Sequence, residues 1–178
     1  MNKQMMKHMS SAMISCMILM PAGVLHAAQS SQSHAVRVQI PQALSFTGDS
    51  SALTLSFSDV AKGSESDIKT ITYSIKANNV ARQNGVIQAN LSGPLDNVDL
   101  MAKVGTYRKQ AGNGQLIAEY DGFKTVGQAE VNLCNRKTDF GNGRVLMGQI
   151  PINYKAIATN DLERSPNTQT LHITLADI

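Results

Sequence analysis

The sequence lacks tryptophan altogether and has only four phenylalanines and four tyrosines. Several of these few aromatics, among them Phe46, Phe57, Tyr73 and Tyr154, fall on the apolar side of alternating segments, where a core needs them. The chain therefore has little material for a surface of exposed rings, the usual platform for carbohydrate binding. A lectin site built from Asn and Asp side chains stays open.

The residues that usually carry catalysis are equally scarce. His34 and His172, the two histidines beyond the N-terminal segment, have no metal-ligand spacing to a second histidine or a carboxylate. The glycine-rich residues 112–114 and 141–143 are followed by no Lys-Ser/Thr pair and open no helix, so they are not phosphate loops. We expect a protein that is not an enzyme, with no catalytic, cofactor-binding or metal-binding residues and no cofactor.

The N-terminal segment has the features of an export signal. Lys3 and Lys7 give a positive start, residues 12–25 form an apolar run, and Ala27 offers a small residue for cleavage. The run is shorter than the ~20 residues that a membrane span requires, and no later run is longer. We expect residues 1–27 to be removed as a signal peptide and no stable membrane insertion; an uncleaved N-terminal anchor is the alternative.

Cysteine and charge are both limited in the remaining residues 28–178. Cys16 leaves with the signal, so Cys134 has no partner for an intramolecular disulfide and is either a buried small hydrophobe or an intermolecular partner. Without Lys3 and Lys7 the 16 Lys+Arg fall to 14, against 13 Asp+Glu. This balance, with no basic cluster containing aromatics, predicts no nucleic-acid partner.

Residues 36–40 form a short amphipathic segment. Val36, Val38 and Ile40 alternate with Arg37 and Gln39, so an extended backbone places all three apolar side chains on one face. Small polar residues precede it. We assign residues 28–40 to an N-terminal extension and residues 41–178 to a single domain. The spacing alone leaves open whether the apolar face enters the protein's own core or a neighbouring copy.

Strand-like segments separated by Gly, Asn, Asp and Pro recur about every ten residues, and no segment keeps a helical period. Residues 116–126 predict a hairpin turned at Asp121-Gly122, and Pro151 predicts a strand that bends or changes sheet. The remaining segments predicted as strands are 43–47, 52–57, 69–77, 86–91, 98–104, 129–133, 144–150, 152–158 and 170–175. This pattern favours an all-β, antiparallel immunoglobulin-like sandwich, with a closed barrel as the alternative.

The order of these segments resembles that of the pilin subunits of bacterial chaperone-usher fimbriae. The likeness rests on the leader, the alternating residues 36–40, Pro41, the Ala-Leu-Ser-Phe of residues 43–46, the Thr-Ile-Thr-Tyr-Ser-Ile of residues 70–75 and the final alternating segment. The single Cys134 points to the cysteine-poor alternate class and the related spore-coat-U-like secreted proteins.

The resemblance implies an incomplete sandwich that a donor strand from a neighbouring subunit completes. Val36, Val38 and Ile40 would be the donor side chains, and Leu171, Ile173 and Leu175 would line the rim of the acceptor groove. The expected function is a structural subunit of a surface fimbria; a self-complete secreted binding module or fimbrial tip adhesin is the alternative. The implied partners are neighbouring pilin subunits in a homopolymer or hetero-fibre, a periplasmic chaperone and an outer-membrane usher. The implied location is the cell surface, or the medium, after passage through the periplasm.

Overall fold

The computed structural model of the chain describes residues 37–38, 43–49, 51–137, 143–163 and 168–176. The chain divides into two units, Met1–Gln39 and Ile40–Ile178. Of the first unit, Arg37 and Val38 are described, and both side chains are exposed. Donor candidates Val36 and Ile40 lie outside the described residues.

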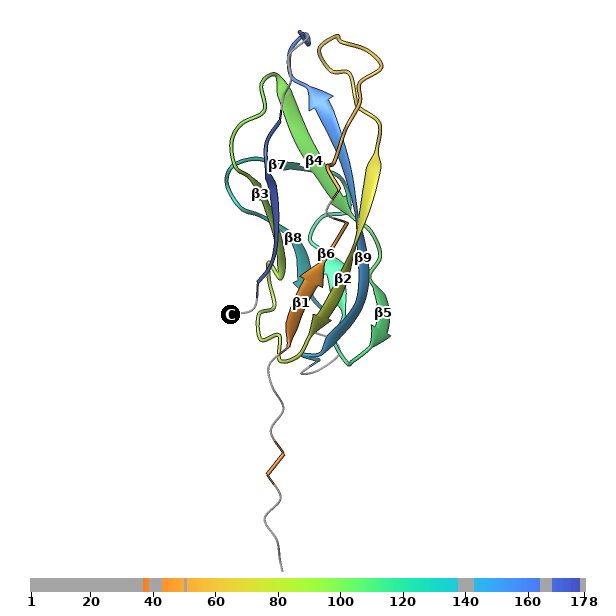
Figure 1. Cartoon of the computed structure of the whole chain (residues 1–178), viewed down its shortest axis with the longest axis vertical. Coiled ribbons are helices and arrows are strands. Elements are labelled where there is room, and N and C mark those ends of the chain that lie inside the picture. Colours follow the sequence, from red (N-terminus) through yellow and green to blue (C-terminus); the bar gives the residue numbers. More distant parts are fainter. Residues whose placement is uncertain (1–36, 39–42, 50, 138–142, 164–167, 177–178) are drawn as a thin grey trace, which may run out of the picture. The chain divides into compact units, whose positions relative to one another are not determined.

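The second unit is an all-β sandwich of antiparallel strands, as the alternating pattern predicts (Figure 1). None of the described residues forms a helix that could span a membrane. The ten strands are β1 (Leu44–Thr47), β2 (Lys69–Ala77), β3 (Ile87–Leu91), β4 (Val98–Val104), β5 (Arg108–Ala111), β6 (Leu116–Ala118), β7 (Lys124–Val126), β8 (Val131–Arg136), β9 (Leu146–Ala158) and β10 (Leu171–Leu175).

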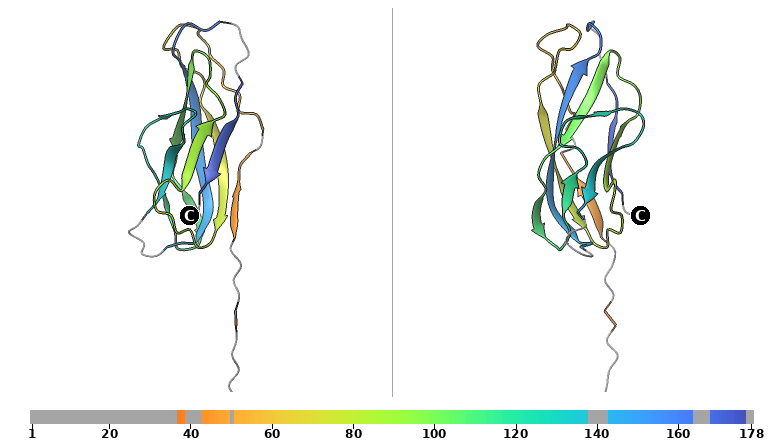
Figure 2. Two further views of the ribbon diagram at one scale, coloured as in Figure 1. Left: turned by 90° about the vertical axis from the view of Figure 1, so that its left-hand side faces the viewer. Right: turned by 180° about the vertical axis from the view of Figure 1, so that it is seen from behind.

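These strands form two sheets that face each other, as the turned views show (Figure 2). The six-stranded sheet has the order β1-β2-β9-β4-β7, with β5 also paired to β9. The four-stranded sheet has the order β10-β3-β8-β6. Within the described residues, β1 and β10 are therefore terminal strands of their sheets and do not pair with each other. The two sheets stay separate, so the alternative of a closed barrel is wrong.

The core lies between the sheets and is built from the alternate residues of each strand. On β9, every second residue from Leu146 to Ala158 is buried. The fully buried Ile150, Ile152 and Tyr154 meet residues from the opposite sheet such as Ile87 and Leu133 in one apolar cluster. A two-residue period with one dry face is what a sandwich strand requires.

β9 continues through Pro151 within one sheet, so of the two predicted outcomes the change of sheet is wrong. The Pro151 carbonyl accepts the Gly105 N–H, so Pro151 directs its backbone toward the side of β9 where β4 and β5 lie. The β4 ladder ends at Ile152 and the β5 ladder begins at Gln149. The missing proline N–H therefore falls in the gap between two partner strands, where no ladder bond is lost.

The predicted hairpin at Asp121-Gly122 is also wrong. β6 pairs with β8 in the four-stranded sheet, whereas β7 pairs with β4 in the six-stranded sheet. The turn carries the chain from one layer to the other, so Leu116 and Val126 enter the core from opposite sheets. A hairpin would have placed both side chains in the same layer.

Candidate functional site

A groove opens between the two sheets on the side of the sandwich that β1 and β10 border. It encloses about 1180 Å³ and receives residues from both layers, including Ile71 and Tyr73 of β2, Leu91 of β3 and Leu171 of β10. Its lining residues are Asp49, Ser51, Ala52, Leu53, Thr54, Leu55, Phe57, Ile71, Tyr73, Leu91, Leu95, Asp96, Asn97, Val98, Leu100, Ala156, Leu162, Glu163, Thr168, Gln169 and Leu171. The bottom of the groove is therefore formed by side chains of the hydrophobic core.

One rim of the groove is the segment of residues 51–57. Leu53, Leu55 and Phe57 are half-buried, while the residues between them are exposed. The segment is anchored at its far end, where Ser56 exchanges hydrogen bonds with Asp67 and Phe57 bridges Ser66. From Ala52 to Leu55 no ladder partner lies among the described residues, so only the last two residues of the strand predicted for residues 52–57 are paired.

The other rim is the start of β10, where Leu171 lines the groove together with Thr168 and Gln169 before it. Leu171, Ile173 and Leu175 alternate with exposed residues and point inward, and burial increases along the strand until Leu175 is buried. Within the described part of the chain β10 pairs only with β3, so its second edge has no ladder. An edge with free backbone donors and acceptors is a template for a further strand.

Aromatic packing closes the inner end of the groove. The Phe46 ring of β1 stacks on Tyr73, with 4.9 Å between ring centroids and 8° between planes. The Tyr73 hydroxyl lies 3.0 Å from the Tyr154 hydroxyl in the interior. Burial raises the pKa of both tyrosines, so both hydroxyls stay protonated at neutral pH and the pair satisfies its own polar atoms.

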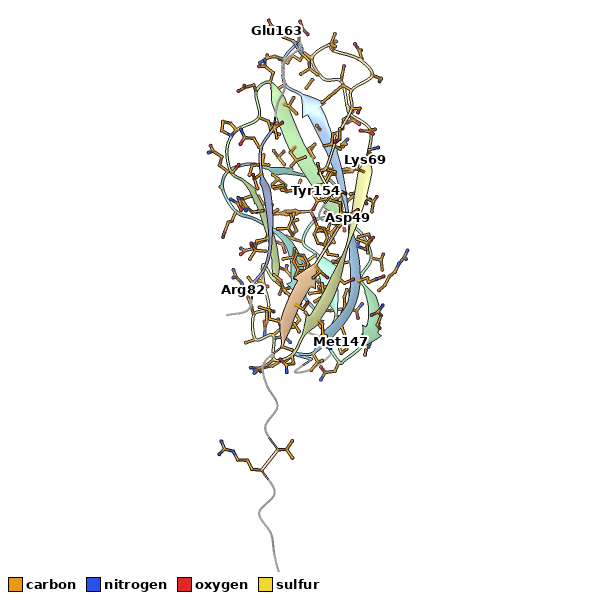
Figure 3. The ribbon with its side chains drawn as sticks, viewed as in Figure 1. Asp49, Lys69, Arg82, Met147, Tyr154 and Glu163 are labelled. Atoms are coloured by element: carbon orange, nitrogen blue, oxygen red, sulfur yellow. The ribbon has the colours of Figure 1, made fainter. Side chains whose placement is uncertain are left out.

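The charged side chains that line the groove are all acidic. Asp49, Asp96 and Glu163 contribute carboxylates, and no lysine or arginine lines it among the described residues. Figure 3 shows Glu163 at the end of the sandwich toward which the groove extends. A strand that carries positive charge beside an apolar face matches this combination of surfaces.

The expected site residues are distributed unevenly over this site. Leu171 lines the groove, whereas Ile173 and Leu175 lie further along β10 and pack against the core. Val38 is 77% exposed. The sequence interpretation did not identify Leu53 and Leu55 as rim residues, although their alternation was visible.

The described residues offer little for other chemistry. They contain no group of three or more His, Cys, Asp or Glu that could hold a metal ion. His172 is exposed, as its position among inward-facing leucine and isoleucine predicts. Cys134 is a free, fully buried thiol, the first of the two alternatives that the sequence left open.

No family model matches the sequence, and no curated protein matches it either. The class defined by fold and site is an antiparallel β-sandwich with a groove along one side, whose lining combines core side chains with polar and acidic ones. Function is inferred from that groove and from the segments of this chain.

Proposed function

We propose that the chain is a structural subunit of an exported surface fibre, in which residues 36–40 of one copy enter the groove of a neighbouring copy as an added strand. The observation that carries the proposal is the groove itself, because its rims at residues 52–55 and at β10 have no ladder partner facing it among the described residues. Strand addition supplies main-chain hydrogen bonds to such rims and lets alternate side chains fill the pockets.

The extension fits the groove in length and pattern. Residues 36–40 match the five residues of β10, so an added strand could pair along all of it. Val36, Val38 and Ile40 would face Leu53, Leu55 and the core beneath them. Each fully buried Val or Ile contributes about 1.5 to 3 kcal/mol, so three of them give a stable contact.

Charge favours the same segment. Arg37 lies between Val36 and Val38, so in an inserted strand it points away from the core. The carboxylates of Asp49, Asp96 and Glu163 border the groove into which the segment would fit. A cationic donor and an acidic groove attract each other, whereas an acidic strand would be repelled.

In this setting the sandwich is an incomplete immunoglobulin-like domain. Its apolar groove must be covered before assembly, because exposed core surface and open strand edges lead to aggregation. A periplasmic chaperone would cover it during export, and an outer-membrane usher would pass it to the next subunit. The mature fibre would then lie on the cell surface.

The test uses the chain purified after export. We expect ladders that survive SDS at room temperature and collapse on boiling. Val38→Asp should abolish them, because a carboxylate would be buried in an apolar groove. Gln39→Asp is the matched control, since the neighbouring side chain points the other way. Monomers in the unsubstituted chain, or ladders that Val38→Asp leaves intact, would overturn the proposal.

A second measurement separates donation to a neighbour from insertion into the same chain. The Val38→Asp chain is mixed with a fluorescent synthetic peptide of residues 28–40. Saturable binding by anisotropy, absent for a peptide with the same Val38→Asp change, supports an open groove. A Val38→Asp chain that unfolds in circular dichroism, with no ladders in the unsubstituted chain, would instead indicate a self-complete binding module.

A further inference from the structure

One end of the sandwich is strongly basic. It comprises the end of β2, β5, the end of β8 and the described loop residues 78–86, 112–115, 137 and 143–145. Its cations are Lys76, Arg82, Arg108, Lys109, Arg136, Lys137 and Arg144. No aspartate or glutamate occurs among these residues; Glu119, just after β6, contacts the Asn135 side chain at the border of the basic end, and Asp139 lies outside the described residues.

The basic end is a fixed surface because its loops are hydrogen-bonded to one another. The Val80 N–H donates to the Arg144 carbonyl at 2.9 Å, and the Gly114 N–H donates to the Val145 carbonyl at 2.8 Å. The Arg136 guanidinium is buried and contacts carbonyl oxygens of two of these loops. The backbone positions that carry Arg82 and Arg144 are therefore tied to one another at this end of the sandwich.

The opposite end of the sandwich is acidic and contains the mouth of the groove. Its carboxylates are Asp59, Glu65, Asp67, Asp96, Asp99, Asp161 and Glu163, while Asp49 lies midway along the sandwich. Its described cations are Lys62, Lys69 and Lys155, and Arg164 lies outside the described residues. Lys69 and Lys155 are already paired with Asp67 and Glu65. Figure 3 shows the separation of the ends, with Glu163 at one and Met147 near the other.

The chain connects the donor segment to the basic end. The Ala43 N–H donates to Asn78 Oδ1 at 2.6 Å, which places Ala43 beside the loop that carries Arg82. Ile40 is three residues earlier, so it lies within about 11 Å of Ala43 along an extended chain. A donor strand that runs antiparallel to β10 leaves the acceptor's groove at the end where β10 begins, so it brings its own basic end close to the acceptor's acidic end.

We infer that copies of this chain dock basic end to acidic end, and that this charge complementarity selects the head-to-tail orientation and speeds strand insertion. The inference rests on the proposed function, because it specifies how the donor's sandwich meets the acceptor's. Opposed ends attract, while two basic or two acidic ends repel. Clustered charges of this kind raise association rates and lose their effect as salt screens them.

The experiment joins a chain that cannot donate to a chain that cannot accept. Val38→Asp provides the acceptor and Leu55→Asp, which blocks the groove, provides the donor. Their mixture can form only one SDS-resistant dimer, and its rate of appearance is measured at about 0.01 M and about 1 M salt, where the Debye lengths are about 30 and 3 Å.

We expect Arg108→Glu or Lys109→Glu in the donor to slow dimer formation about three-fold at low salt and to leave the high-salt rate and the final yield unchanged. Adding Glu163→Lys to the acceptor should restore the low-salt rate. The control is Lys124→Glu in the donor, because it changes the net charge equally on β7, outside the basic end.

Equal slowing by Lys124→Glu and Arg108→Glu would overturn the inference, since it would report net charge alone. Unchanged rates for Arg108→Glu would also overturn the inference. The proposed function would still stand in that case, because the SDS-resistant dimers would still form. Failure of the proposed function looks different, because the unsubstituted chain then forms no SDS-resistant species at any salt concentration.

Discussion

The hydroxyl groups of Tyr73 and Tyr154 lie 3.0 Å apart between β2 and β9, beneath the floor of the groove. Tyr154 is fully buried and Tyr73 is 8% exposed. One hydroxyl donates and the other accepts, so the pair places two polar atoms in an apolar core at little cost. Because Tyr73 also stacks on Phe46, the pair fixes the wall against which an inserted strand would pack.

Removing both hydroxyls of this pair should destabilise the sandwich by less than the sum of the two single removals. Tyr73→Phe leaves the Tyr154 hydroxyl buried without a partner, which costs about 1 to 3 kcal/mol, and Tyr154→Phe acts in the same way on Tyr73. The double variant leaves no orphaned hydroxyl and should lose less than the sum. Urea unfolding of the four proteins gives the coupling energy; strictly additive losses would contradict the pairing.

Arg136 joins two loops at the basic end, so its loss should cost stability. Its guanidinium nitrogens donate to the carbonyls of Ala81, Arg82 and Gly143 at 3.3 to 3.4 Å. Arg136→Met keeps the apolar stem but leaves these carbonyls without donors, and we expect a loss of about 2 to 4 kcal/mol in urea unfolding. Arg144→Met, an exposed cation on the same surface, serves as the control and should change stability by about 0.5 kcal/mol or less.

Sequence patterns predicted the strands well wherever an alternating segment has paired neighbours. The segments at residues 69–77 and 98–104 have the observed bounds of β2 and β4. β5 was missed because all four of its residues are exposed, so it has no apolar alternation. Gly85 has φ +61° and a Cβ there would meet the Asn132 side chain, so this position favours glycine.

The groove could not be derived from the sequence because it depends on which strands stay unpaired. Alternation at residues 52–57 predicts a strand with one apolar face, yet it does not reveal that residues 52–55 have no ladder neighbour. The carboxylates around the groove come from loops far apart in the sequence, such as those of Asp96 and Glu163. These carboxylates come together because of the order in which the strands pair. The alternation of apolar and polar residues along a strand does not reveal that order.

A charge placed on the groove side of residues 51–57 should prevent strand acceptance without unfolding the domain. Leu55→Asp directs a carboxylate into the apolar groove, where an inserted Val or Ile would have to bury it. We expect SDS-resistant ladders to disappear. Ser58→Asp, just beyond the segment, is the matched control, because Ser58 is exposed and does not line the groove, so ladders should persist. Identical behaviour of the two variants would contradict the assignment of this rim.

Cys134 should make stability fall at alkaline pH. Burial raises the pKa of its thiol from 9.0 to about 12, so the thiol is protonated in both folded and unfolded chains well below pH 9. Above pH 9 the unfolded chain releases this proton while the folded chain keeps it, and between about pH 8 and about pH 10 the free energy of unfolding should fall by about 1.4 kcal/mol. Urea unfolding under reducing conditions measures this loss, and Cys134→Ala should remove most of it over this range. Native protein should also resist maleimide and form no disulfide-linked dimer, whereas the urea-unfolded chain should react with maleimide. Rapid labelling of the native protein would contradict the burial of the thiol. An equal alkaline loss of stability in Cys134→Ala would show that this thiol does not cause the loss.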